Sequence, residues 1–292
     1  MSRTGAGLLS GLAAAAIWGG MYVVSKVVLE VIPPFTLITS RLLLGGLALW
    51  VIIAIRGGLH VPAGEFWRVF GVGVVGYGIS LGFQFVGTKL STAANGSLVT
   101  SATPAFILLF AALILGEKIT RRRLLSLLLA TLGVLAVIDP RSARVAPDLF
   151  WGNLSLLAAA LTWALYSVLI RLVTRQLDVL SVSLIAFLGG LPVAVPAGLW
   201  ENSTQGIGPI NAVIIAGVLF LGIICTALAM ALWNNAFAQL DAGLASLTFF
   251  AQPVVGTLLG WLFLRETITP LFLLGGLLVA LGLVVASRET AS

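Results

Sequence analysis

The stretch AANGSLVTSATPAFILLFAALILGEKIT, residues 93–120, returns 149 positions later as AGLASLTFFAQPVVGTLLGWLFLRETIT, residues 242–269. Eleven of the 28 paired positions are identical, among them Pro104 with Pro253 and Glu117 with Glu266. Each copy is a long apolar run that contains a proline, ends at a carboxylate and is followed by another apolar run. The repeat predicts a chain made of two copies of one unit.

The composition predicts an integral membrane protein. Hydrophobic residues make up 60% of the 292 residues and charged residues 9%, whereas a soluble domain carries about 25% charged residues. The net charge of +6 does not indicate a nucleic-acid partner, because Lys and Arg lie at the ends of apolar runs or between them. The single cysteine, Cys225, lies inside an apolar run, and we expect neither a metal nor a cofactor.

Apolar runs of roughly membrane-spanning length divide the chain into two halves. A polar stretch at residues 139–148 separates them and predicts one five-helix unit at residues 1–140 and a second at 148–292. We predict an all-α fold of ten transmembrane helices, near residues 7–29, 35–55, 67–88, 92–115, 124–138, 151–172, 179–200, 210–236, 243–264 and 270–286.

Five spans per half imply that the second unit enters the membrane from the side opposite to the first. Ten Lys and Arg fall on the side of the amino terminus and six on the other, which favours both termini in the cytoplasm of a multi-pass membrane protein. Inverted repeats can open alternately to the two sides and are typical of transporters. The one histidine, His60, lies in a loop and no nucleophile is paired with a base, so an enzyme is not expected.

Two aromatic pairs at the start of the halves indicate a central cavity. Trp18 and Trp163 are equivalent after a shift of 145 and fall near the middle of their helices, whereas membrane tryptophans usually lie at the interface. Polar residues within spans usually face inward. We predict one cavity between the first, third, fourth, sixth, eighth and ninth helices, with seven residues facing it: Trp18, Tyr22, Tyr77, Gln84, Trp163, Tyr166 and Gln252.

Two further groups carry hypotheses. Pro104 and Pro253 each lack an amide hydrogen and crowd the carbonyl four residues back, so we predict kinks that act as hinges, although a purely static kink is the alternative. Arg41 has no counterpart in the second half. Two roles stay open for it, contact with an anionic group such as a carboxylate or a place at the membrane interface. Lys26 and Arg171 are equivalent, which favours a structural role for both.

The pattern of Trp18-Gly19, Lys26, Arg41, Pro104 and residues 116–118 resembles the EamA repeat of the drug/metabolite transporter superfamily. The second half resembles it again through Trp163, Tyr166, Arg171, Pro253, Glu266 and Gly282. The resemblance implies an inner-membrane carrier that exports amino acids, including aromatic ones, or other metabolites. One departure is Met21, where many relatives carry asparagine. We expect a small-molecule substrate, a lipid bilayer as surroundings and a monomer.

Other functions remain as alternatives. Export of cationic drugs through a carboxylate in the first helix is disfavoured, because residues 5–25 contain no acid. A carrier of nucleotide sugars or phosphate esters needs several basic groups near the midplane, and Lys26 and Arg41 are the two that come close. A membrane scaffold without transport is the third alternative.

Overall fold

The computed structural model describes residues 3–116, 120–138, 146–174, 177–240, 245 and 248–290, and these form helices and connecting turns without a β-strand. Glu117 and most of the predicted linker lie outside them. The helices of the first half are α1 (Arg3–Val28), α2 (Pro34–Ile55), α3 (Ala63–Gly73), η1 (Val74–Ser80), α4 (Leu81–Leu90), α5 (Ala93–Thr100), α6 (Thr103–Leu115) and α7 (Arg121–Ile138). Those of the second are α9 (Pro147–Thr174), α10 (Val179–Thr204), α11 (Ala212–Leu219), η2 (Phe220–Leu228), α12 (Ala229–Gln239), η3 (Thr248–Phe250), α14 (Ala251–Leu264) and α15 (Pro270–Thr290).

The helices form a bundle of membrane-spanning elements. Seven helical stretches of the described chain are long and apolar enough to cross a membrane, and Ala251–Leu264 and Pro270–Gly282 are shorter apolar helices. Large aliphatic side chains such as Leu113 and Leu277 lie exposed on the outside, as expected of a surface that faces lipid. The fold is therefore an all-helical, multi-pass membrane architecture, and the count of ten spans stays a prediction.

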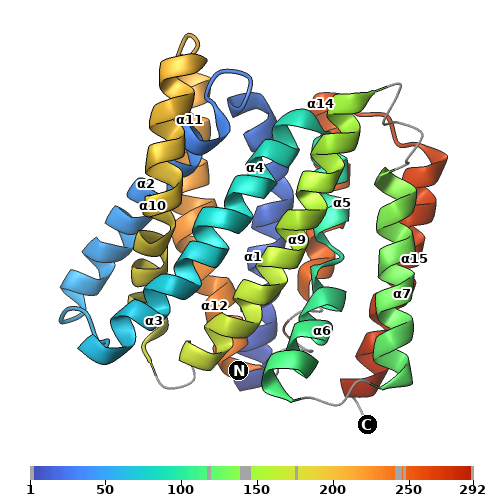
Figure 1. The fold of residues 1–292 in the computed structure, drawn as a ribbon, viewed down its shortest axis with the longest axis horizontal. Helices are drawn as coiled ribbons and strands as arrows, with labels where there is room; N and C mark the ends of the chain where they lie inside the picture. Colours follow the sequence, from blue (N-terminus) through green and yellow to red (C-terminus); the bar gives the residue numbers. More distant parts are fainter. Residues whose placement is uncertain are drawn as a thin grey trace.

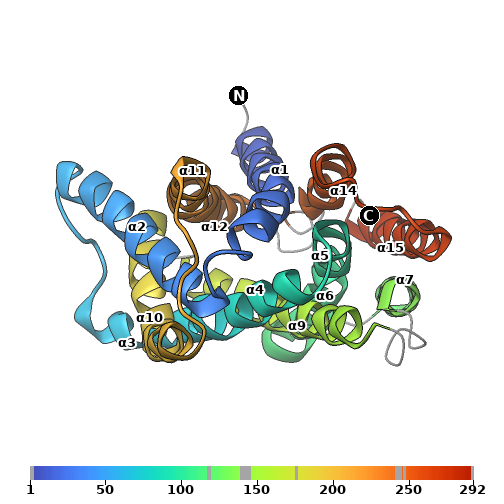
Figure 2. The same cartoon turned by 90° about the horizontal axis from the view of Figure 1, so that it is seen from above.

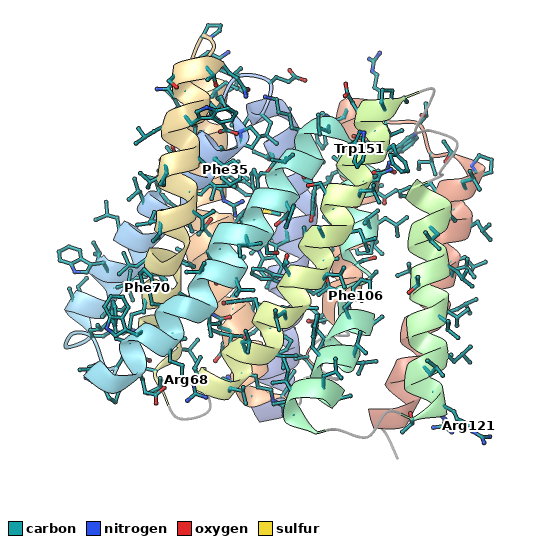
Figure 3. The ribbon with its side chains drawn as sticks, in the orientation of Figure 1. Phe35, Arg68, Phe70, Phe106, Arg121 and Trp151 are labelled. Atoms are coloured by element: carbon teal, nitrogen blue, oxygen red, sulfur yellow. The ribbon has the colours of Figure 1, made fainter. Side chains whose placement is uncertain are left out.

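The two halves run in opposite directions through the bundle. The start of α1 and the end of α15 lie at one edge, which we call the terminal edge (Figure 1). Arg68 and Arg121 lie at this edge, whereas Phe35 and Trp151, near the start of α9, lie toward the opposite or far edge (Figure 3). Viewed from above, α7 and α15 form a pair at one end of the bundle, and α2 and α3 lie at the other (Figure 2).

The third predicted helix of each half contains a π-helical stretch, η1 in the first and η2 in the second. Glycines let neighbours approach the first of these closely. A Cβ atom at Gly76 would overlap the ring of Tyr166, and one at Gly73 would overlap the backbone of Ala186. A π-helical turn carries one residue more than an α-helical turn and is frequent at functional sites. Both stretches lie beside the central cavity of the candidate functional site.

The fourth predicted helix is interrupted just before Pro104, and the hinge at this point stays a prediction. The fourth predicted helix ends at Thr100 and resumes at Thr103, so Pro104 is the second residue of a new helix, where its missing N–H leaves no hydrogen bond unmade. The carbonyl of Thr100 accepts a hydrogen bond from the hydroxyl of Thr103 at 2.6 Å. Pro253 likewise lies in the first turn of α14, directly after the 3₁₀ turn η3.

Candidate functional site

A small cavity lies at the centre of the bundle, between the two halves. Its volume is about 20 Å³, which is room for about one water molecule. Its lining comes from α1, the region of η1 and α4, α5 and α6, α9, α12, and η3 and α14, which are the six segments expected to frame it. The lining residues are Trp18, Met21, Tyr22, Ser80, Gln84, Thr100, Thr103, Ala159, Ala160, Trp163, Met230, Phe249 and Gln252.

Aromatic rings form one wall of the cavity. Trp18 and Trp163 are edge-on to each other with ring centroids 5.7 Å apart, and Phe249 lies 5.8 Å from Trp18. The indole N–H of Trp18 donates to the backbone carbonyl of Cys225 at 3.1 Å. The indole N–H of Trp163 is buried and has no hydrogen-bond partner. Because unpaired buried donors are rare, this nitrogen is a candidate contact for a ligand.

A chain of hydrogen bonds forms the polar wall and joins the two halves. Gln84 Nε2 donates to the hydroxyl of Tyr22 at 2.8 Å, and Tyr22 lies 2.8 Å from the hydroxyl of Thr100. From the second half, Gln252 Nε2 donates to the same Thr100 oxygen at 2.7 Å. Thr100 in turn donates to the carbonyl of Gly96 at 2.6 Å. One threonine hydroxyl therefore connects α1, α4 and α14.

Tyr77 and Tyr166 do not line the cavity, in contrast to the sequence-based expectation. Both are fully buried, and their hydroxyls are 2.7 Å apart, with Tyr166 also 3.3 Å from Asn234. The Tyr166 ring lies 4.6 Å from Trp163, which is the residue that faces the cavity. The Tyr166 ring packs directly against Gly76 of η1, where a side chain larger than hydrogen would not fit. The other five predicted residues surround the cavity, and their role in binding stays a prediction.

Arg41 is fully buried in α2 beside the cavity. Its Nε donates to the hydroxyl of Thr226 at 3.0 Å, and its guanidinium lies 4.6 Å from the centre of the Phe85 ring. Its two terminal nitrogens, Nη1 and Nη2, have no hydrogen-bond partner. The interfacial role considered for Arg41 is therefore excluded by its burial.

Three charged side chains bond to backbone groups at the far edge of the bundle. Lys26 Nζ donates to the carbonyls of Thr88, Lys89 and Ser91, where α4 ends. The carboxylate of Glu266 accepts from the first two backbone N–H groups of α5, at 2.6 and 2.7 Å. Glu201 does the same for α2 at 2.7 and 3.1 Å. Anions at helix N-termini are favourable because the backbone N–H groups there are otherwise unpaired.

Eight lining residues lie outside the predicted set: Met21, Ser80, Thr100, Thr103, Ala159, Ala160, Met230 and Phe249. Thr100 and Phe249 each lie four positions before a proline, where the backbone carbonyl loses its usual hydrogen-bond partner, and that spacing is a signal that could have pointed to them. Met230 lies in a uniformly apolar run, which carries no comparable signal.

Comparison with known proteins gives matches along nearly the whole chain. The model of the EamA-like transporter family matches residues 5–138 and again residues 150–288. An uncharacterized transporter of Archaeoglobus fulgidus is 24% identical over 275 residues and covers 94% of each chain. The transporter YetK of Bacillus subtilis, also uncharacterized, is 28% identical over 263 residues, which is 87% of this chain and 78% of the relative.

Two further matches bear on function and fold. A protein of Salmonella typhimurium named "Probable amino-acid metabolite efflux pump" is 27% identical over 289 residues, or 94% of this chain and 92% of the relative. A solved crystal structure, 25% identical, covers 99% of each chain with a TM-score of 0.71. Because the family model matches two successive segments that together span most of the chain, the protein belongs to the EamA-like transporter family, within the drug/metabolite transporter superfamily.

Proposed function

We propose that this transporter exports amino acids, aromatic ones included, by alternating access through the central cavity. The observation that carries the proposal is the pairing of a tryptophan wall, Trp18 and Trp163, with an amide and hydroxyl wall, Gln84 and Gln252. Rings pack against varied side chains, and neutral hydrogen-bonding groups suit the polar end of a zwitterion. The amino-acid efflux named for the Salmonella relative supports the same substrate class.

The cavity in this conformation is too small for an amino acid, so substrate enters only after it widens. The hydrogen bonds of Lys26, Glu266 and Glu201 hold the far edge shut. We propose an inner-membrane location with both termini in the cytoplasm, which makes the far edge the outer one. The conformation is then one that is closed to the outside.

Substrate is proposed to run down its own gradient without proton coupling. The carboxylates of Glu201 and Glu266 lie at helix ends, bonded to backbone N–H groups, and not beside the cavity. Proton carriers in transporters are commonly carboxylates or histidines inside the membrane. Substrate-driven pH change in proteoliposomes, at a fixed ratio to flux, would contradict this part of the proposal.

Counterflow in proteoliposomes tests the substrate class. Vesicles loaded with an unlabelled compound are assayed for uptake of the same compound in labelled form, over a panel of amino acids, sugar phosphates and quaternary amines. We expect exchange of amino acids, with aromatic ones among them, and none of the other two classes. Exchange confined to sugar phosphates or quaternary amines would favour the corresponding alternative carrier, and absence of any flux would favour a scaffold.

A matched pair of tryptophan variants tests the site. Trp163→Ala removes half of the aromatic wall, and we expect flux to fall by about tenfold, because a buried aromatic contact contributes about 0.5–1.5 kcal/mol beyond its burial. Trp200→Ala is the control, since Trp200 is 64% exposed on the outside. Gln84→Ala should also reduce flux with unchanged expression. Normal flux in Trp163→Ala and Gln84→Ala would remove both residues from the site.

A further inference from the structure

The guanidinium of Arg41 lacks the partner that a buried charge requires. It is 0% exposed, and Nη1 and Nη2 make no hydrogen bond. No described carboxylate forms an ion pair with it, and the titratable side chains around it are those of Cys225, Tyr22 and Tyr77, which carry no negative charge at neutral pH. A buried charge without a partner costs several kcal/mol, and within a membrane it usually marks a functional site.

Two pairs of neighbouring residues tie Arg41 to the cavity. On α4, Gln84 lines the cavity while the next residue, Phe85, lies under the guanidinium. On η2, Cys225 accepts the hydrogen bond from Trp18 through its carbonyl, and the next residue, Thr226, accepts the bond from Arg41 Nε. The charge therefore contacts residues next in sequence to Gln84, which lines the cavity, and to Cys225, which bonds the cavity residue Trp18.

The unpaired buried nitrogens of this region are all donors. They are Arg41 Nη1 and Nη2, the indole nitrogen of Trp163 on the cavity wall, and that of Trp233, which packs against Trp18; the hydroxyls of Ser25 and Thr39 are the other unpaired buried polar groups of the described side chains. Donors without acceptors fit a ligand that brings acceptor oxygens. With Nε fixed by Thr226, the two terminal nitrogens remain for the two oxygens of one carboxylate, the geometry that guanidinium prefers.

From these observations we infer that Arg41 is the anchor for the substrate's carboxylate, reached when the cavity widens toward α2. This inference rests on the proposed export of amino acids. A carboxylate carries one negative charge and matches the single guanidinium, whereas a phosphate monoester carries about two and leaves one without a partner here. The π-helical stretches η1 and η2 border the route, and such stretches occur at functional sites.

Four probes that share one phenyl ring separate the contributions of the polar groups. L-phenylalanine carries both charges, 3-phenylpropanoate only the carboxylate, phenethylamine only the amine, and phenyl phosphate a phosphate group. Binding to the purified full-length protein is measured by calorimetry, and transport by counterflow. For the wild type we expect phenylalanine and 3-phenylpropanoate to bind about tenfold or more tightly than phenethylamine.

Variants of Arg41 then test the anchor, with Arg68→Gln as the exposed control of the same chemistry. Arg41→Gln should weaken both carboxylates by about tenfold or more and leave phenethylamine unchanged, so that the preference for carboxylates disappears. Arg41→Lys keeps the charge but loses the two-nitrogen geometry, and should retain part of the preference. Unchanged phenethylamine binding shows that each variant is folded.

The outcomes distinguish the anchor from the wider proposal. If Arg41→Gln keeps the carboxylate preference, or weakens all probes equally, Arg41 is not the anchor even though amino-acid export stands. If the wild type prefers phenyl phosphate and loses it with Arg41, the site takes phosphate and both proposals fail. If the wild type takes phenethylamine alone, amino-acid export fails and the anchor fails with it.

Discussion

The two proline-bearing segments, residues 93–115 and 248–264, share a sequence pattern, and where both are described each has a turn and then a helix that carries the proline in its first turn, but their surroundings differ. In the first, α5 begins with three paired N–H groups, two bonded to Glu266 and one to Thr92, and Pro104 is buried at the break that follows. In the second, the described part opens with a 3₁₀ turn, and Pro253 is half-buried beside an apolar groove that Trp261 also lines. The two equivalent segments therefore have different surroundings in this conformation.

In any single conformation of an inverted repeat that is closed at one edge, the two copies must differ in their surroundings. If the two copies had identical structures, both edges of the bundle would be equally open or equally closed. An asymmetric pair closes one edge, and exchange of the two arrangements would close the other. In the described chain Pro104 is buried and Pro253 is half-buried, and Glu266 caps α5 at the far edge, so we expect this cap to help close that edge. Four substitutions test this reading.

The largest effect is expected from Glu266→Ala, which leaves the start of α5 without its carboxylate. Two charge-assisted hydrogen bonds are lost, and we expect about 2 kcal/mol less stability of the closed far edge, or about thirtyfold more opening. The readout is the labelling rate of Ala94→Cys by an impermeant maleimide, in a Cys225→Ala background. Glu65→Ala, on the exposed side of α3, is the control. Equal labelling in both variants would mean that Glu266 does not hold the edge.

Pro104→Ala restores an N–H at the break between α5 and α6. The Thr100 carbonyl could then accept a backbone bond in place of the Thr103 hydroxyl, and a continuous helix becomes possible. We expect exchange between the two open forms to slow by about tenfold with little change in substrate affinity, because a continuous helix lacks the soft joint between α5 and α6. Distances between spin labels at the two edges measure this exchange, and an unchanged rate would place the hinge elsewhere.

Thr92→Ala should have a smaller effect of the same sign as Glu266→Ala. The Thr92 hydroxyl accepts from the backbone N–H of Asn95 at 3.0 Å, and loss of such a cap costs about 1 kcal/mol, or about fivefold in opening. The same cysteine-labelling assay applies. Thr92→Ser, which retains the acceptor, should label like the wild type. A Ser variant as open as the Ala variant would assign the effect to the lost methyl group.

Pro253→Ala should have the smallest effect. Pro253 lies in the first turn of α14, where an N–H would have no partner within the helix, and its half-buried ring loses little contact. We expect the exchange rate to change by less than about threefold. An effect as large as that of Pro104→Ala would show that the two segments are mechanically equivalent despite their different burial.

Much of the architecture could be predicted from the chain itself. Hydropathy indicates membrane-spanning helices, because their length and composition are set by the lipid around them. The 149-residue repeat indicates two units and a central cavity, because both follow from symmetry. Trp18, Gln84 and Gln252 were found because a large aromatic or amide residue at mid-span is unusual. Tyr77 and Tyr166 follow the same rule, yet they bond to each other behind Trp163. Which of two inward-facing residues reaches the centre depends on helix rotation, and a single sequence does not specify that rotation.

The broken helix could be predicted only in part. A proline predicts a disturbance one turn upstream, but whether the helix bends or stops depends on what satisfies the released carbonyl. Here a hydroxyl from Thr103 does so, and that geometry is set by tertiary packing. The partner of Glu266 could not be predicted either, because its carboxylate bonds the start of a helix 172 residues away in sequence.

The π-helical stretches offer a way for a movement to pass along a helix. A π-helical turn holds one surplus residue, and if that surplus moves along the helix, each residue it passes turns by about 100° and shifts by about 1.5 Å. As this happens, the backbone exchanges one set of hydrogen bonds for another. Trp18 and Arg41 are both attached to η2, at Cys225 and Thr226. A single migrating turn would therefore rotate both attachments together, without either neighbouring helix having to unfold.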